Sequence, residues 1–211
     1  MAKFHHGING PFSGKLGTVV GATWKGIPYM RSLPIRTAKA TAGEKANRAR
    51  FTIAQQWLSP LLDFVRVGFK GYTPTVEGFI AAKSYLMKNA MEGTGAESHV
   101  NPILMKVSFG DLSLSDNIAL QLSADKKSLQ FNWDTAIVKE GSHKDQVMML
   151  AYNIEKRFAY FNTFGALRYT GTDSLKLINA KKDSTWHIYV AFVAADRSRQ
   201  SDSVYLGEIT F

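Results

Sequence analysis

The side chains that most often carry catalysis or bind metals are sparse in this 211-residue chain. There are five histidines and no cysteine. His5 and His6 lie beside the N-terminus, and His99, His143 and His187 fall in a predicted linker, turn and strand, none with a partner at metal-site spacing. We therefore expect no metal site. The absence of cysteine excludes disulfides, thiol catalysis and thiolate ligands.

The remaining motifs of catalysis are also missing. The nucleophile pattern Gly-x-Ser-x-Gly is absent. The segment 14–17 reads Gly-Lys-Leu-Gly, but it lacks the Gly-x-x-x-x-Gly-Lys-Ser/Thr pattern of a phosphate loop. Most carboxylates fall in predicted turns, where solvated charge is a simpler interpretation than an acid–base pair. No reaction class is supported, so we expect a protein that is not an enzyme, with no cofactor and no small-molecule substrate.

Charge is distributed very unevenly along the chain. The formal net charge is +9; residues 1–70 hold 11 Lys and Arg against two acidic residues, whereas residues 71–211 hold 15 of each kind. The first 43 residues contain no carboxylate at all. This asymmetry indicates a polyanion, an anionic surface or an acidic patch on a neighbouring subunit as partner.

The basic N-terminal segment, residues 1–40, combines regularly spaced glycine with residues that favour strands. Glycine raises the entropic cost of ordering this backbone, while the side chains between the glycines are strand formers. We therefore interpret the segment as an arm that becomes ordered by pairing with another molecule, although pairing within its own chain stays open. The predicted assembly residues are Phe12, Leu16, Val19, Val20, Trp24, Ile27 and Tyr29, and the predicted basic contacts are Lys15, Lys25, Arg31 and Arg36.

Residues 41–95 have helical periodicity. Thr41 and Glu44 form a capping-box pattern that predicts a helix start, and Pro60 should kink or divide this helix near Ser59. A second helix is predicted from Thr73-Pro74 to Gly93, followed by a linker up to Pro102. We expect the apolar face of the first helix to pack inside the protein, and its residues are Trp57, Leu58, Leu61 and Leu62.

From residue 102 onward the pattern changes to the alternation of β-strands. Alternating segments cover 118–123, 128–133, 146–152 and 185–193, and turn residues separate them. The layout resembles the fibronectin type III and immunoglobulin-like group: 128–133 is similar to a second strand ending in the core residue Trp133, and 186–193 with 203–211 to the last hairpin. The predicted fold class is α+β: a glycine-rich β arm, two helices and an antiparallel β-sandwich over 102–211.

The arm also carries a resemblance to a family. The stretch from Gly10 to Ser32 contains Gly-Pro-Phe-Ser-Gly-Lys-x-Gly and Trp-Lys-Gly-x-x-Tyr-x-Arg. In this pattern, followed by a helical part and a β-rich end, the chain resembles an uncharacterised Bacteroidota domain-of-unknown-function family. The resemblance implies no activity and no catalytic residues.

Composition and hydropathy narrow the remaining possibilities. The chain is 45% hydrophobic, enough for a substantial core. No run of about 18 apolar residues is long enough to cross a bilayer, and the N-terminus lacks the apolar run of a signal peptide. We expect a soluble protein without a membrane span. Its localisation is not given by the sequence, and an extracellular filament or a virion-like particle would both fit.

The leading hypothesis is a non-enzymatic structural subunit that assembles with copies of itself into a filament or particle. The N-terminal arm would supply strand addition, in which main-chain hydrogen bonds give affinity and alternate side chains fill pockets on a neighbour. The alternative is a nucleic-acid-binding protein whose basic residues contact phosphates while its aromatic residues stack on bases.

Overall fold

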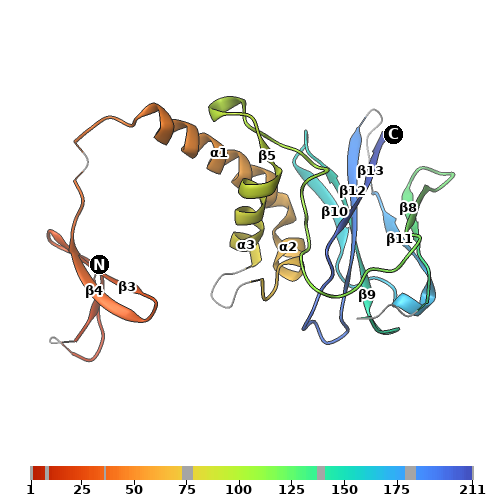
Figure 1. Ribbon diagram of the computed structural model, residues 1–211, viewed down its shortest axis with the longest axis horizontal. Coiled ribbons are helices and arrows are strands. Elements are labelled where there is room, and N and C mark those ends of the chain that lie inside the picture. The colour runs from red at the N-terminus through yellow and green to blue at the C-terminus, as the bar shows by residue number, and fades with distance from the viewer. Residues whose placement is uncertain are drawn as a thin grey trace. The chain divides into compact units, whose positions relative to one another are not determined.

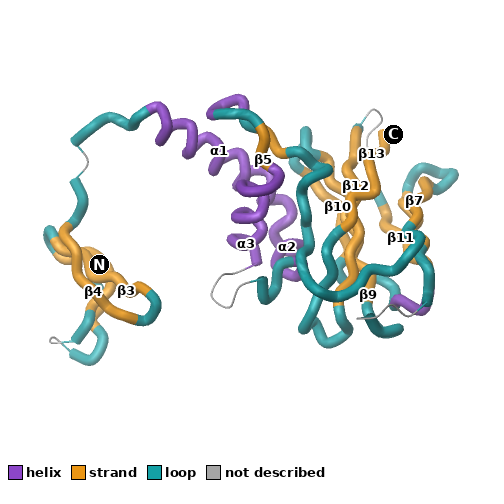
Figure 2. The backbone as a smooth tube through the Cα atoms, viewed as in Figure 1, coloured by secondary structure: helices purple, strands orange, loops and turns teal. Residues whose placement is uncertain are grey.

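The computed structural model describes residues 2–7, 10–35, 37–72, 78–136, 141–178 and 184–210. The chain divides into two compact units, Met1–Thr41 and Ala42–Phe211. The first contains strands only, and the second contains helices and two larger antiparallel sheets (Figures 1 and 2). The protein is therefore a mixed α+β protein, as predicted.

The first unit is an antiparallel sheet of neighbouring strands. Its strands are β1 (Lys3–Phe4), β2 (Phe12–Leu16), β3 (Val19–Trp24) and β4 (Ile27–Ser32), in the order β1-β2-β3-β4. Lys25 and Gly26 join β3 to β4 with φ of 49° and 83°, the two positive values that a type I′ hairpin turn requires. The expectation that this segment obtains its strand partners from another molecule is wrong, because its strands pair with one another.

The second unit opens with a helix that is broken where the sequence predicted. Helix α1 (Ala42–Leu58) starts directly after Thr41, and a 3₁₀ turn, η1 (Ser59–Leu61), separates it from α2 (Leu62–Gly68). Pro60 lies inside the 3₁₀ turn, because proline has no N–H to continue the α-helical hydrogen bonds. The Ser59 hydroxyl donates to the Gln55 carbonyl at 2.7 Å and closes the end of α1.

The next segment departs from the prediction. Helix α3 (Gly78–Tyr85) continues as a π-helical turn, η2 (Leu86–Ala90), and ends there rather than at Gly93. The last residues of the predicted helix instead form β5 (Met91–Glu92), which pairs across the 3₁₀ turn η3 (Gly95–Glu97) with β6 (His99–Val100) in the predicted linker. Because Met91 and Glu92 pair with β6, their backbone is extended and not helical. The predicted helix start at Thr73-Pro74 lies outside the described residues.

Two antiparallel sheets follow. They have the strand orders β10-β9-β12-β13 and β11-β8-β7. The predicted strand segments correspond to β7, β8, β9, β12 and β13, whereas β10 and β11 were not predicted. The strands are β7 (Ala119–Leu122), β8 (Ser128–Asn132), β9 (Gln146–Asn153), β10 (Phe158–Asn162), β11 (Thr172–Lys176), β12 (Thr185–Val193) and β13 (Val204–Thr210), with a 3₁₀ turn, η4 (Arg168–Thr170), before β11.

Strands β9 and β12 are buried on both faces. One set of their residues joins β8 and β11 in a core between the two sheets, and the alternate set joins a second core with the helices (Figure 1). In the second core, Trp57 packs edge-on against Tyr152 at 5.0 Å between ring centroids, and the Tyr152 hydroxyl donates to the Trp57 carbonyl at 2.9 Å. The predicted inward packing of Trp57, Leu58 and Leu61 is confirmed, while Leu62 is half-buried.

Arg168, a buried arginine, joins the segments that precede β7, β9 and β11 through its side-chain contacts. The Arg168 guanidinium lies 3.1 Å from an Asp145 carboxylate oxygen and donates to the Ser115 hydroxyl at 2.8 Å. It also lies over the Phe192 ring, with 4.2 Å between the guanidinium carbon and the ring centroid. Burial lowers the pKa of Arg168, and Asp145 opposes that shift. The Trp133 indole N–H donates to the Arg168 carbonyl at 2.8 Å, so the same residue also positions the core tryptophan.

The buried pair gives a stability prediction. Arg168→Met should lower the free energy of unfolding by about 3–5 kcal/mol, because it leaves the Asp145 carboxylate buried without its partner. Arg199→Gln, which breaks the exposed pair with Asp111, is the matched control and should cost much less, because water screens an exposed ion pair. Urea unfolding of both variants provides the measurement, and equal losses would contradict the role given to Arg168.

Candidate interaction surface

The strand register of the first unit sorts its side chains onto two faces. Directly paired residues share a face, so the pairs Trp24–Ile27, Ala22–Tyr29 and Val20–Arg31 lie on one side, and Lys15 joins them through its pairing with Val20. We call this side the basic–aromatic face. Its residues are Lys15, Val20, Ala22, Trp24, Ile27, Tyr29 and Arg31.

Large apolar side chains on the basic–aromatic face are open to solvent. Trp24 is 63% exposed, Ile27 65% and Tyr29 43%. Lys25, in the turn beside them, places its ammonium 5.0 Å from the centre of the Trp24 ring, within the range of a cation–π contact. Three of the four predicted basic contacts, Lys15, Lys25 and Arg31, therefore lie on or beside this face. The fourth, Arg36, lies outside the described residues.

The opposite face carries the other predicted assembly residues. Leu16 and Val19 pair with each other on this side, and Met30, 71% exposed, lies opposite Gly21. Gly21 is buried because the Phe12 backbone crosses it, and a β-carbon at Gly21 would overlap the Phe12 carbonyl oxygen. The seven predicted assembly residues thus do not form one surface, since strand alternation divides them between two.

Strand β4 is an edge of its sheet. In a two-residue hairpin the residues beside the turn exchange hydrogen bonds, and every second pair then does the same. The bond from the Leu33 N–H to the Thr18 carbonyl, 2.7 Å, continues that pattern. Met30 and Ser32 therefore direct their N–H and C=O groups away from β3. Within the part of the chain that the structure describes, no strand pairs with this side of β4.

The histidines of the second unit are dispersed. The His187 ring lies 2.9 Å from the Tyr205 hydroxyl, and the His99 ring lies 3.4 Å from a Glu92 carboxylate oxygen. Among the described residues no three His, Asp or Glu side chains gather in a metal-binding group. Burial lowers the pKa of His187, and the facing Glu208 opposes this. His99 lies in β6 and His187 in β12, on different sheets.

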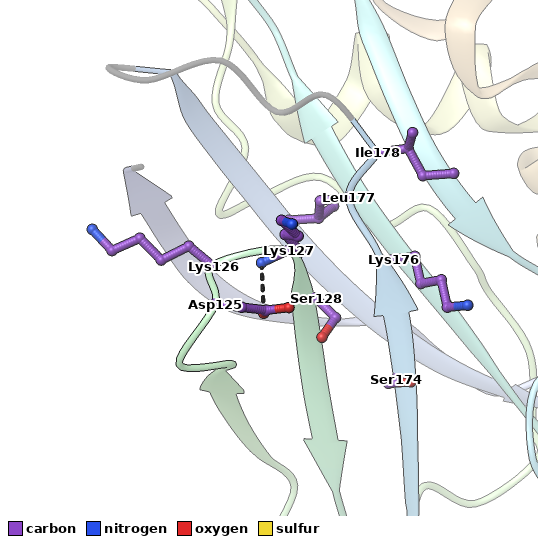
Figure 3. A pocket seen from close by; sticks show the side chains of 8 residues that line it. All are labelled: Asp125, Lys126, Lys127, Ser128, Ser174, Lys176, Leu177 and Ile178. Carbon is purple, nitrogen blue, oxygen red and sulfur yellow. Dashed lines mark hydrogen bonds between the residues drawn. The ribbon is translucent and has the colours of Figure 1, made fainter.

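A hollow of about 580 Å³ at one end of the sheets is lined by lysines (Figure 3). Lys126 and Lys176 point away from each other, and the Lys127 backbone N–H donates to the Asp125 carboxylate at 3.0 Å. The ammonium groups do not converge on a common point. Lys126 and Lys127 lie in the connection between β7 and β8.

A family model for a family of unknown function, DUF6266, matches residues 11–207. The chain belongs to that family. No curated protein and no solved structure matches it. The expected membership of an uncharacterised family is confirmed, and the matched region of this DUF6266 protein runs from just before β2 into β13. The expected Bacteroidota origin and shared arm motif remain predictions.

None of the described helices is long and apolar enough to cross a membrane.

The crossing at Gly21 gives a prediction for the first unit. Gly21→Ala should open the sheet, because the new methyl group overlaps the Phe12 backbone. Trypsin should then cut after Lys15, Lys25 and Arg31 at least several-fold faster, while the second unit keeps its thermal transition. Gly43→Ala is the control, because its β-carbon meets no atom within 4 Å and alanine favours the helix. Unchanged cleavage in Gly21→Ala would contradict the described packing.

His187 gives a prediction on pH. Its folded-state pKa lies below the ordinary value of 6.5, so the unfolded chain binds more protons at mildly acidic pH. The free energy of unfolding should therefore be highest above pH 6.5 and should decrease as the pH falls toward the lowered pKa. His187→Gln should remove this part of the decrease. Chemical unfolding at a series of pH values tests it, and an identical pH profile in the variant would refute the assignment.

Proposed function

We propose that this chain is a non-enzymatic structural subunit that assembles with copies of itself through the edge of its N-terminal sheet. The observation that carries the proposal is the exposed edge of β4, where all six residues are exposed and the backbone groups of Met30 and Ser32 face away from β3. Such an edge is a template for another strand. Folded proteins usually cover or blunt a strand edge of this kind, so a partner strand is a direct explanation for it.

In this proposal assembly uses the β4 edge, whereas the sequence analysis assigned it to the whole segment 1–40. The strands of the first unit satisfy most of their backbone groups on each other, so addition of a strand would use Met30 and Ser32 and not the full segment. Pro28 has no N–H to donate, which limits pairing at the turn end of β4. A β4 edge that pairs with the β4 edge of another copy closes a two-fold dimer. Pairing with a different edge continues into a filament or ring.

The second unit would act as the rigid body of such a subunit. We propose that its two sheets form a sandwich of the immunoglobulin or fibronectin type III kind. The orders β11-β8-β7 and β10-β9-β12-β13 support this, since strands one, two and five form one sheet and strands three, four, six and seven the other. Trp133, just after β8, fills the core between them against Phe192 at 5.5 Å between ring centroids.

A single substitution at the edge tests assembly in the full-length protein. Met30→Pro removes an N–H that points away from β3, so it should leave the β3–β4 hairpin paired while it blocks an incoming strand. We expect the unchanged protein to form oligomers or filaments by light scattering and electron microscopy. The variant should show at least a tenfold loss of assembly.

Met30→Thr is the matched control, because it removes the same side chain but keeps the N–H and favours a strand. It should assemble like the unchanged protein. If the unchanged protein is a monomer at high concentration, or if Met30→Pro assembles as well as Met30→Thr, the proposal is refuted.

A further inference from the structure

The two units differ sharply in charge. Residues 1–41 hold six Lys and Arg and no Asp or Glu, whereas residues 42–211 hold 20 Lys and Arg and 17 Asp and Glu. Both units therefore carry a net positive charge. A second copy of this chain offers no net countercharge to the first unit, so the basic–aromatic face is better matched to an anionic partner of another kind.

The sheet register brings cations and aromatic rings onto one surface. Lys15 and Arg31 flank Val20 in one row of the sheet, Tyr29 occupies the next row, and Trp24 lies beyond it. Strands advance about 3.3 Å per residue, so these same-face rows are about 7 Å apart. This is the distance over which successive unstacked nucleotides can extend along a chain. Lys25 adds a third cation beside the Trp24 ring.

We propose that the basic–aromatic face binds single-stranded nucleic acid. Lys15, Lys25 and Arg31 contact phosphates, and the exposed rings of Trp24 and Tyr29 stack on unpaired bases. Each base has a flat π surface, so stacking of this kind tolerates any sequence. A double helix keeps its bases stacked inside and offers the rings no such surface, and an acidic protein would satisfy the cations but would not need the exposed tryptophan.

This site does not depend on the proposed assembly. Assembly uses the backbone edge of β4 at Met30 and Ser32, whereas nucleic-acid binding uses side chains on one face of β2, β3 and β4. The two can be separated by experiment, because Met30→Pro should lose assembly and keep nucleic-acid binding.

Fluorescence anisotropy with a labelled oligothymidine strand, titrated with the full-length protein at several salt concentrations, tests the proposal. The logarithm of affinity should fall linearly with the logarithm of salt concentration. Changing Lys15, Lys25 and Arg31 together to Gln should reduce the slope by about 2, since each phosphate contact on a single strand contributes about 0.7. Trp24→Ala with Tyr29→Ala should weaken binding by roughly tenfold or more with little change in slope.

The hollow in Figure 3 supplies the matched control. Changing Lys126, Lys127 and Lys176 together to Gln removes the same charge from the second unit and should leave affinity and slope nearly unchanged. Resistance to thermolysin, which cuts before apolar residues such as Leu16, Val19 and Val20 that every variant keeps, confirms that each variant keeps the first unit folded. The proposal is overturned if no single-stranded oligonucleotide binds at low salt, or if the Lys126, Lys127 and Lys176 control weakens binding as much as the triple substitution on the basic–aromatic face. It is also overturned if double-stranded DNA binds equally well and the Trp24→Ala, Tyr29→Ala variant binds it with unchanged affinity.

Discussion

The central sheet β10-β9-β12-β13 has two faces to bury, and the architecture of the second unit follows from that. Strands β9 and β12 are apolar at nearly every position, so alternate residues enter different cores. The β11-β8-β7 sheet covers one face and the helices cover the other. Both the helices and the β11-β8-β7 sheet are needed for stability, because without either one a continuous apolar face of the β10-β9-β12-β13 sheet would be exposed to water. The helical segment is thus part of the same folded body as the strands.

Two buried tyrosine hydroxyls inside these layers have specific partners. The Tyr152 hydroxyl bonds the helix layer to the sheet, and the Tyr189 hydroxyl donates to the Pro102 carbonyl at 2.7 Å. Burial raises the pKa of Tyr152 to about 12 and raises that of Tyr189 further, so both remain protonated donors at neutral pH. Arg168 has a similar role at the other core. These hydrogen bonds and the buried ion pair join the layers of the second unit.

The first unit, unlike the second, has too few strands to bury its large apolar side chains. Its few short strands cannot enclose a core, so Trp24, Ile27 and Met30 stay open to water although the sheet is paired internally. A small sheet with an exposed edge, exposed aromatic rings and no Asp or Glu of its own has the features on which the two proposals rest. The edge and the basic–aromatic face are separate in their chemistry, since one offers backbone groups and the other offers side chains. The two proposals therefore use different parts of the same small unit.

The sequence by itself determined the features that depend on near neighbours. The helix start after Thr41, the break at Pro60, five of the seven strands of the larger sheets and the concentration of positive charge were all predictable, because capping, proline geometry and alternation act over a few residues. Only the tertiary structure decided that the N-terminal strands pair with one another, that Met91 leaves the helix to pair with Val100, and that Arg168 is buried. Strand pairing and register arise from hydrogen bonds between residues on different strands, which the alternation along a single strand does not specify, and register also divided the predicted assembly residues between two faces.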